Sequence, residues 1–312
     1  MINPEIERKV LNILEEEVVP AQGCTEPIAI AFTAAKAREI LGDTVERVVI
    51  KVSGNMIKNV KSVVVPNSGG LVGIETSAAM GIVAGHSRRD LMVISDITSE
   101  EMVLVNAFLA RNCIEVIHEE TDAKLYVKVT VYAKEEEASV EIKHMHTNIT
   151  QMSKNGVLIL DRPCNDTDFN SASEDREILN IERIYGMAHS IELAKISPLF
   201  EKVIELNSII AHEGLEGVYG VNIGKIICDN IKKGFYGDDV RNRSAAFASA
   251  GSDARMSGCA LPVMTTSGSG NQGMTSSLAL IEYANFFKVE REKLIRALFF
   301  SHLATVHIKT NV

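Results

Sequence analysis

The spacing of hydrophobic residues changes twice along this chain, and these changes limit the folds that it can adopt. Residues 4–19 carry apolar side chains at helical intervals. Residues 124–132 instead alternate apolar and polar side chains, as a half-buried strand does, and residues 138–146 repeat the alternation. From residue 178 onward the helical spacing returns. Because the two periods belong to different regular elements, the chain predicts separate helical and sheet regions.

These regions predict an α+β fold in three parts. Residues 1–113 form an N-terminal α/β part, and residues 176–312 form a helical part; together they make one catalytic body, in which the helical part is incomplete. Residues 114–175 form an inserted antiparallel β-rich module that ends in a polar linker. The acidic run Glu135–Glu137 suits a hairpin turn within this module. We expect the module to be peripheral, and it is a candidate dimerisation surface.

The individual elements follow from the same patterns. Pro20 is expected to end the first helix, and Thr25 is expected to cap the second. Helices are expected at residues 4–19, 28–41, 71–84, 99–111, 178–195, 199–212, 217–233, 240–256, 274–285 and 290–304, and strands at 45–53, 124–132, 138–146 and 156–160.

Composition excludes several classes of protein. A chain of 312 residues with 46% hydrophobic content can bury a sizeable core. The formal net charge of −9 argues against a nucleic-acid partner, because phosphate binding needs a positive surface. The first residues are polar and charged, so we expect no secretion signal. No apolar run reaches the roughly 18 residues that a membrane span needs. The expected compartment is the cytoplasm.

Of the five cysteines, Cys24 has the most reactive setting. It lies in a loop at the start of a predicted helix, where the helix dipole favours a thiolate. Such a thiolate could be a metal ligand or a nucleophile, although a buried capping cysteine is an equally simple reading. Cys259 is a second-rank candidate because it lies near a glycine-rich loop. Cys113, Cys164 and Cys228 carry no comparable polar motif and are expected to be small buried hydrophobes.

Four breaks between apolar segments combine small residues with polar side chains. Glycine lets the backbone approach a ligand closely, and free N–H groups at a helix start attract anions. The last break is the strongest candidate because it directly precedes a helix. Its Gly-x-Gly-x-x-Gly spacing does not predict a dinucleotide site, since no βαβ unit surrounds it. The four breaks are residues 23–27, 53–59, 65–70 and 267–273.

Several other polar residues could carry chemistry. Lys58 lies in the second break, after the strand-ending Ser53-Gly54-Asn55, and could bind a carboxylate, or act as a base if it were desolvated. His144 and His146 lie two apart in a predicted strand and so face the same side. His302 and His307 lie five apart, whereas helical ligand pairs prefer four. Neither histidine pair is expected to bind a metal.

Read together, the breaks resemble the L-cysteine desulfidase family, which is related to the alpha part of bacterial iron–sulfur L-serine dehydratases. Each motif alone is modest, but their order and number make the resemblance specific. The residues that carry it are Gly23-Cys24-Thr25-Glu26-Pro27, Ser53-Gly54-Asn55 with Lys58-Asn59, Pro66-Asn67-Ser68, Ser252-Asp253-Ala254-Arg255-Met256, and Leu261-Pro262-Val263-Met264 through Gly268–Gly273.

The resemblance implies a chemistry as well as a fold. Members of that family hold a 4Fe–4S cluster with three cysteines and leave the fourth iron open for substrate. They convert L-cysteine to pyruvate, ammonia and sulfide by β-elimination: a base removes the α-proton while the open iron acts as a Lewis acid. By resemblance, Cys24 is a cluster ligand and Lys58 the candidate base. The substrate-binding residues implied are Ser53, Asn55, Asn67, Ser68, Asn271 and Gln272.

The sequence departs from the family pattern after the last motif. Family members place two more cluster cysteines in Leu-Cys-Gly and Cys-Asp-Gly-Ala-Lys segments, and this sequence contains neither. The remaining cysteine ligands of a 4Fe–4S cluster are therefore absent from the chain. We interpret the chain as C-terminally truncated, either as a fragment or as the product of a shortened gene that we expect to be inactive.

Two alternative functions remain open. The first is L-serine dehydratase, in which hydroxide leaves instead of sulfide from a similar site. The second is a cluster-free pseudoenzyme that binds an amino acid in the glycine-loop pocket. In each case the predicted partner is L-cysteine or a similar small amino acid. We expect a homo-oligomer with no nucleic-acid or membrane partner.

Overall fold

The computed structural model describes residues 3–166 and 176–310. The chain folds as two compact units, one of residues 22–171 and one of residues 1–21 together with 172–312. We call the first the sheet unit and the second the helical unit. The sequence predicts a division of the chain at residues 113 and 175, by the expected roles of its parts. The two structural units do not test those roles, so that division stays a prediction.

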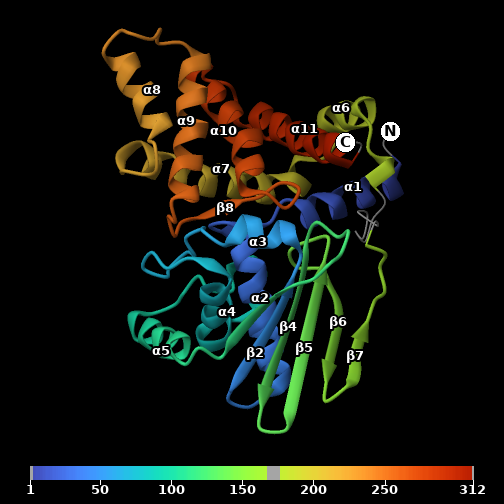
Figure 1. Ribbon diagram of the computed structural model, residues 1–312. Helices are drawn as coiled ribbons and strands as arrows, with labels where there is room; N and C mark the ends of the chain where they lie inside the picture. The colour runs from blue at the N-terminus through green and yellow to red at the C-terminus, as the bar shows by residue number, and fades with distance from the viewer. Residues whose placement is uncertain (1–2, 167–175, 311–312) are drawn as a thin grey trace. The chain divides into compact units, whose positions relative to one another are not determined.

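The sheet unit is built on one six-stranded sheet with the order β3-β2-β4-β5-β6-β7 (Figure 1). Strands β2 and β3 are parallel, and every other neighbouring pair is antiparallel. Alternating valines and isoleucines on β2 and β4 are buried, as the period of a strand on a core requires. The strands are β2 (Arg47–Val52), β3 (Ile114–His118), β4 (Tyr126–Ala133), β5 (Glu136–Lys143), β6 (Ile149–Lys154) and β7 (Val157–Asp161).

One helix, α2 (Thr25–Leu41), packs against this sheet. It lies against β4 and β5 on one side and against α4 (Gly73–Ala84) on the other (Figure 1). Its alanines allow this double packing because they bury surface without adding bulk. At Gly81 the two helices almost touch, since a Cβ there would lie 2.1 Å from the carbonyl oxygen of Ala31. Helices α3 (Gly54–Val60) and α5 (Ser99–Ala110) and the short η1 (Ser87–Met92) complete the unit.

The helical unit surrounds a single hydrophobic core. Phe200 and Phe299 are fully buried at its centre, with their rings 6.4 Å apart. Buried Asn207 holds β8 in place: its side chain accepts a hydrogen bond from Met264 N at 2.8 Å. Strands β1 (Pro20–Gln22) and β8 (Pro262–Met264) pair with each other. The helices are α1 (Pro4–Glu17), η2 (Arg176–Ile178), α6 (Ile181–Ser190), α7 (Leu193–Glu216), α8 (Ile223–Lys232), α9 (Val240–Met256), α10 (Gly270–Phe287) and α11 (Arg291–Thr310).

The α+β prediction is confirmed, two local expectations are wrong, and a third is right only in part. Cys24 occupies the capping position expected for Thr25, which is instead the first residue of α2. Helix α7 runs unbroken through Pro198, and the break falls earlier, at residues 191–192. The proline lies near the start of α7, where Ser197 donates a side-chain hydrogen bond to Leu193 O at 2.9 Å. The expected hairpin turn forms at residues 134–135 and so includes Glu135, whereas Glu136 and Glu137 already belong to β5.

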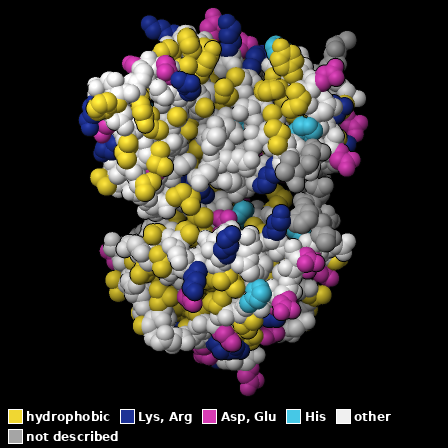
Figure 2. Space-filling view, turned by 45° about the horizontal axis from the view of Figure 1, so that its top comes forward, with side chains coloured by type: hydrophobic (Ala, Val, Ile, Leu, Met, Phe, Trp, Pro, Cys, Tyr) yellow, Lys and Arg dark blue, Asp and Glu magenta, His cyan; other side chains and the backbone are white. Residues whose placement is uncertain are grey.

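Hydrophobic side chains reach the surface of the helical unit in clusters (Figure 2). Phe235 and Tyr236, which follow α8, are 76% and 47% exposed, and Phe287 at the end of α10 is 53% exposed. Within residues 3–166 and 176–310, no helix is both long and apolar enough to cross a membrane.

Glycine is required where α7 crosses α9. A Cβ at Gly214 would lie 1.9 Å from the carbonyl oxygen of Ala250, so Gly214→Ala must push the helices apart. We expect this change to lower the free energy of unfolding by about 1–3 kcal/mol. Gly186 is the matched control, because it is also inside a helix of the same unit but meets nothing within 4 Å. Gly186→Ala should raise stability by about 0.5–1 kcal/mol. Urea unfolding curves measure both, and equal effects would contradict this view of the crossing.

Candidate functional site

Two of the predicted motifs meet in the sheet unit. Gly23 adopts a φ of +58°, and a Cβ at this position would lie 2.0 Å from Cγ of Pro66. The Cys24 loop therefore rests directly on the 65–70 loop, and only glycine permits the contact. Cys24 caps the start of α2 through its backbone alone and is 9% exposed.

The thiol of Cys24 has a carboxylate partner that the sequence did not identify. Cys24 Sγ donates a hydrogen bond to Glu26 Oε2 at 3.0 Å, and Thr25 Oγ1 donates to the same oxygen at 3.2 Å. Burial works to raise the pKa of Glu26, but the bond from Cys24 and the charge of nearby His146 outweigh it, so the pKa is lowered. Glu26 is thus an anion in the first turn of α2, where the helix dipole also favours it.

The predicted site residues of the second break, residues 53–59, differ in burial. Ser53 is 2% exposed and donates its hydroxyl to Lys124 O at 2.9 Å, so this side chain anchors the start of α3. Asn55 and Lys58 are exposed on α3. Among the described residues Lys58 has no hydrogen bond or ion pair, so its ammonium group can meet a ligand from solvent. Its role as a base stays a prediction.

His118 is a further residue at this break that sequence reasoning missed. Strands β2 and β3 run parallel, so their carboxyl ends lie side by side. His118 ends β3, and a Cβ on Gly54 would lie 3.2 Å from its Nε2. Ligands of mixed sheets commonly bind beyond the carboxyl ends of parallel strands. The sequence did not indicate this position for His118 because β3 is short and residues 114–118 were expected only as part of the β-rich module.

The third break is held together by its own side chains. Asn67 has a φ of 60° and donates its amide to Ile94 O at 2.9 Å and Ser95 O at 3.1 Å. Ser68 is buried and donates to Leu71 O at 3.0 Å. These bonds use the donors of both side chains. A ligand would therefore meet acceptor atoms here, such as Asn67 Oδ1.

In the helical unit, the glycine-rich loop leads into α10. Ser269 caps the helix by accepting a hydrogen bond from Gln272 N at 3.3 Å. Arg255, 4% exposed, donates from Nη1 to Asn271 Oδ1 at 3.0 Å. A Cβ on Gly270 would lie 2.4 Å from Arg255 Nε, so the guanidinium lies flat against the start of α10. The two C-terminal motifs therefore form one structure, with a buried cation beside Asn271 and half-buried Gln272.

Comparison with known proteins now decides the family. The model of the serine dehydratase alpha chain matches residues 88–312, which include Arg255 and the whole glycine-rich loop. The chain belongs to the serine dehydratase alpha chain family.

Individual relatives extend the similarity over nearly the whole chain. A protein named UPF0597 from Fusobacterium nucleatum is 57% identical over 97% of this chain and 71% of its own length. UPF0597 proteins of Desulfitobacterium hafniense and Treponema denticola are 46% and 41% identical, each over 97% of this chain and over 69% and 70% of their own lengths. No solved structure matches the chain. These similarities reach the Cys24 loop, which the family match itself does not cover.

The serine dehydratase alpha chain family is generally iron–sulfur dependent. Such clusters are held by several cysteine thiolates. Within the described residues, no three His, Cys, Asp or Glu side chains gather closely enough to hold a metal ion. Cys24 is therefore one candidate ligand, and the described residues do not complete the set that the resemblance implies.

A buried histidine holds the glycine-rich loop from beneath. His302 Nδ1 lies 2.5 Å from Thr266 Oγ1, and that hydroxyl also bonds Thr265 O at 2.9 Å. Since the hydroxyl has one proton and gives it to Thr265 O, the imidazole must donate from Nδ1. Lys309 of the same helix also bonds Ser267 O. His302 is thus a core histidine that fixes the loop.

Burial of His302 should make the helical unit sensitive to acid. Burial lowers the pKa of His302 from 6.5 to about 3. The unfolded chain binds a proton below about pH 6.5 and the folded chain does not, so stability is lost as pH falls through this interval, by up to about 1.4 kcal/mol per pH unit. His302→Asn keeps a donor towards Thr266 but cannot titrate. Urea unfolding between these pH values should show a shallower pH dependence for this variant.

Exposed His189 of α6 provides the control for that measurement. His189→Asn should leave the pH dependence of unfolding as it is in the parent protein. If His302→Asn and His189→Asn gave the same slope, neutral burial of His302 would not be the cause.

Proposed function

We propose that this protein is a lyase that performs β-elimination on a small L-amino acid, with L-cysteine as the substrate. Membership of the serine dehydratase alpha chain family carries the proposal, because that family's name describes elimination from a β-substituted amino acid. The finer choice of cysteine rests on the resemblance of the five motifs to L-cysteine desulfidases.

The reaction balances without a redox partner. A base removes the α-proton of L-cysteine, the Cβ–S bond breaks, and its electron pair leaves with sulfur as sulfide. The aminoacrylate that remains takes up a proton to become an imine. Water hydrolyses the imine to pyruvate and ammonia.

The chain's own residues suggest how the substrate could be held. Exposed Lys58 is the candidate for proton removal at the α-carbon. Taken by itself, the helical unit offers Arg255 beside Asn271 and the N–H groups at the start of α10, a combination of charge and donors that suits a carboxylate. Glu26 accepts the hydrogen bond of the buried Cys24 thiol and so holds that side chain at the start of α2. These assignments are part of the proposal.

L-Serine dehydratase is the second candidate, because the matching family is described by serine. Purified protein should release pyruvate from both amino acids at different rates, and a larger kcat/KM for L-cysteine supports the desulfidase. A larger value for L-serine would favour the dehydratase. Binding of either amino acid with no pyruvate from an iron-loaded preparation would leave the amino-acid-binding pseudoenzyme.

The role of Lys58 can be separated from a general effect of charge. Removal of a general base lowers kcat by about 10²–10⁴-fold, so we expect a loss of this size in Lys58→Met with little change in KM. Lys61→Met is the matched control, because Lys61 is also exposed and follows the same short helix. Steady-state pyruvate release measures both. Equal activity of the two variants would remove Lys58 from the reaction.

The role of Cys24 has its own measurement. Because Cys24 is the candidate ligand among the described residues, any iron and acid-labile sulfide that the parent protein takes up in anaerobic reconstitution should depend on this thiol, and Cys24→Ser should retain much less of both. Cys113→Ser, which changes a half-buried cysteine of the same unit, should retain the parent's iron content. Unchanged iron in Cys24→Ser would show that this thiol holds no cluster.

A further inference from the structure

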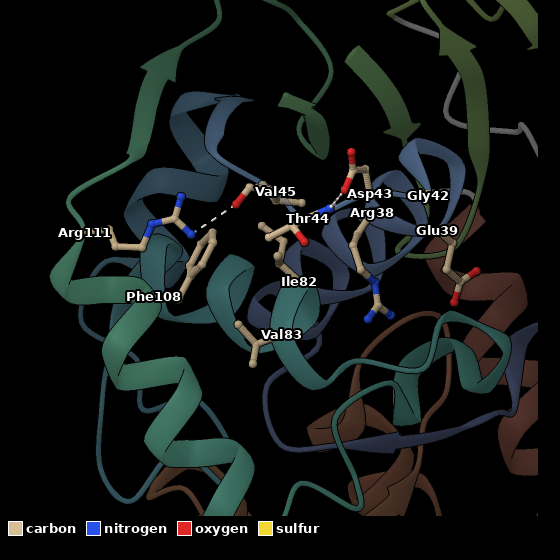
Figure 3. Close-up of a pocket in the computed structure, with 10 residues that line it drawn as sticks. All are labelled: Arg38, Glu39, Gly42, Asp43, Thr44, Val45, Ile82, Val83, Phe108 and Arg111. Carbon is tan, nitrogen blue, oxygen red and sulfur yellow. Dashed lines mark hydrogen bonds between the residues drawn. The ribbon is translucent and has the colours of Figure 1, made fainter. Parts of the chain in front are cut away.

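A pocket of about 570 Å³ lies in the sheet unit at the C-terminal end of α2 (Figure 3). Its volume is within the range of roughly 300–1,000 Å³ that small-molecule sites occupy. Helix α2 contributes Arg38, α4 contributes Ile82 and Val83, and Phe108 and Arg111 come from the end of α5. The helix rise places Cys24, at the other end of α2, about 20 Å away. The pocket is therefore separate from the site described above.

Arg38 has hydrogen-bonding capacity that the protein does not use. Its Nη2 donates to Gly85 O at 2.6 Å, while its Nε is buried and has no hydrogen-bond partner. The α2 dipole favours a cation in this last turn, but the dipole does not supply an acceptor for Nε. Nε is closed off from the pocket, so an anion there would meet Nη1 of Arg38, which forms no hydrogen bond among the described residues.

Arg111 lies on the other side of the pocket (Figure 3). It donates to Val45 O at 3.1 Å and Glu46 O at 2.9 Å, and its guanidinium lies 4.9 Å from the centre of the Phe108 ring. Within the described part of the chain, neither Arg38 nor Arg111 forms an ion pair with a carboxylate. The pocket therefore holds two positive charges that no acidic side chain neutralises by contact.

The two acidic residues of the pocket are engaged elsewhere. Glu39 accepts from the Ser87 hydroxyl at 2.6 Å and backbone N–H at 3.3 Å. Asp43 accepts from Thr44 N at 2.7 Å and from Lys134 Nζ at 3.2 Å. The hydrogen bond from Thr44 N lowers the pKa of Asp43 most, and the bond from Lys134 lowers it further. Asp43 is therefore ionised and bonded to these two donors.

Most of the side chains between the two arginines are apolar. Val45, Ile82 and Phe108 are each at least 90% buried and offer a ligand little surface, whereas half-buried Val83 offers more. An apolar surface between two guanidinium groups suits an anion with a hydrocarbon body better than an inorganic anion. Guanidinium groups bind carboxylates through paired hydrogen bonds.

We propose that this pocket binds a small organic acid, whose carboxylate meets Arg38 and whose apolar body lies against Val83. The inference rests on the pocket alone, so it stands or falls independently of the lyase activity.

Calorimetric titration of the whole protein with benzoate and hexanoate tests the proposal, with inorganic phosphate as a third probe. Both carboxylates should bind and phosphate should not. Arg38→Gln should weaken carboxylate binding by at least about tenfold, because a charge-assisted hydrogen bond is lost. Arg47→Gln is the matched control: Arg47 belongs to the same unit but stacks on Tyr132 outside the pocket. It should bind both carboxylates as the parent protein does.

A measurement on the unaltered protein guards against a variant that misfolds. Benzoate should slow the modification of Arg38 by phenylglyoxal, mapped by mass spectrometry, and should leave the modification of Arg47 unchanged. The proposal is overturned if neither carboxylate binds, if phosphate alone binds, or if benzoate protects both arginines equally.

Discussion

The contact between α2 and α4 at Gly81 is the constraint on which the sheet unit depends. With a Cβ the contact could not form, because the carbonyl oxygen of Ala31 would lie 2.1 Å away. Since α2 also packs on β4 and β5, its position along the sheet is fixed from both sides. Everything that α2 carries at its ends inherits that fixed position. Its first turn presents Cys24 and Glu26, and its last turn presents Arg38 to the pocket.

Close backbone approach organises the helical unit in a similar way. A Cβ on Gly273 would lie 2.1 Å from Met264 O, so α10 starts in contact with β8. Thr265, which follows Met264, donates its N–H to Val19 O at 2.9 Å. This bond joins the end of β8 to the segment after α1. Ser267 and Gly268 both have positive φ angles, which turn the chain between β8 and α10. The loop is held from several sides although most of its residues are small.

The sequence predicted those features that arise from local periodicity. Alternating apolar and polar residues identified β4 and β5. Helical spacing identified α9 with the same first and last residues that the structure shows. Helix α7 was divided at Pro198 because the sequence alone does not show that the proline lies in its first turns. Parallel pairing of β2 with β3 was missed because β3 is short and its partner is distant in sequence.

The candidate site shows the same limit. The motifs around Cys24 and Gly268 were recognisable because their residues are adjacent in the sequence. The Gly23–Pro66 contact, the Glu26–His146 interaction and the place of His118 beside Gly54 depend on tertiary structure, so no pattern along the chain could give them. The sequence predicts Asn55 and Lys58 in a break between apolar segments, whereas α3 carries both on a helical surface.

The parallel pairing of β2 with β3 has a consequence for how the protein reaches its native state. The pair can form only after residues 53–113, with α3, α4 and α5, have been brought back across the sheet. Hairpin β4–β5 closes through a two-residue turn and needs no such search. Closing a long loop costs more chain entropy before any contact repays it, and such contacts slow folding. The edge that bears His118 is therefore expected to assemble late, after the antiparallel strands have provided a surface on which it can dock.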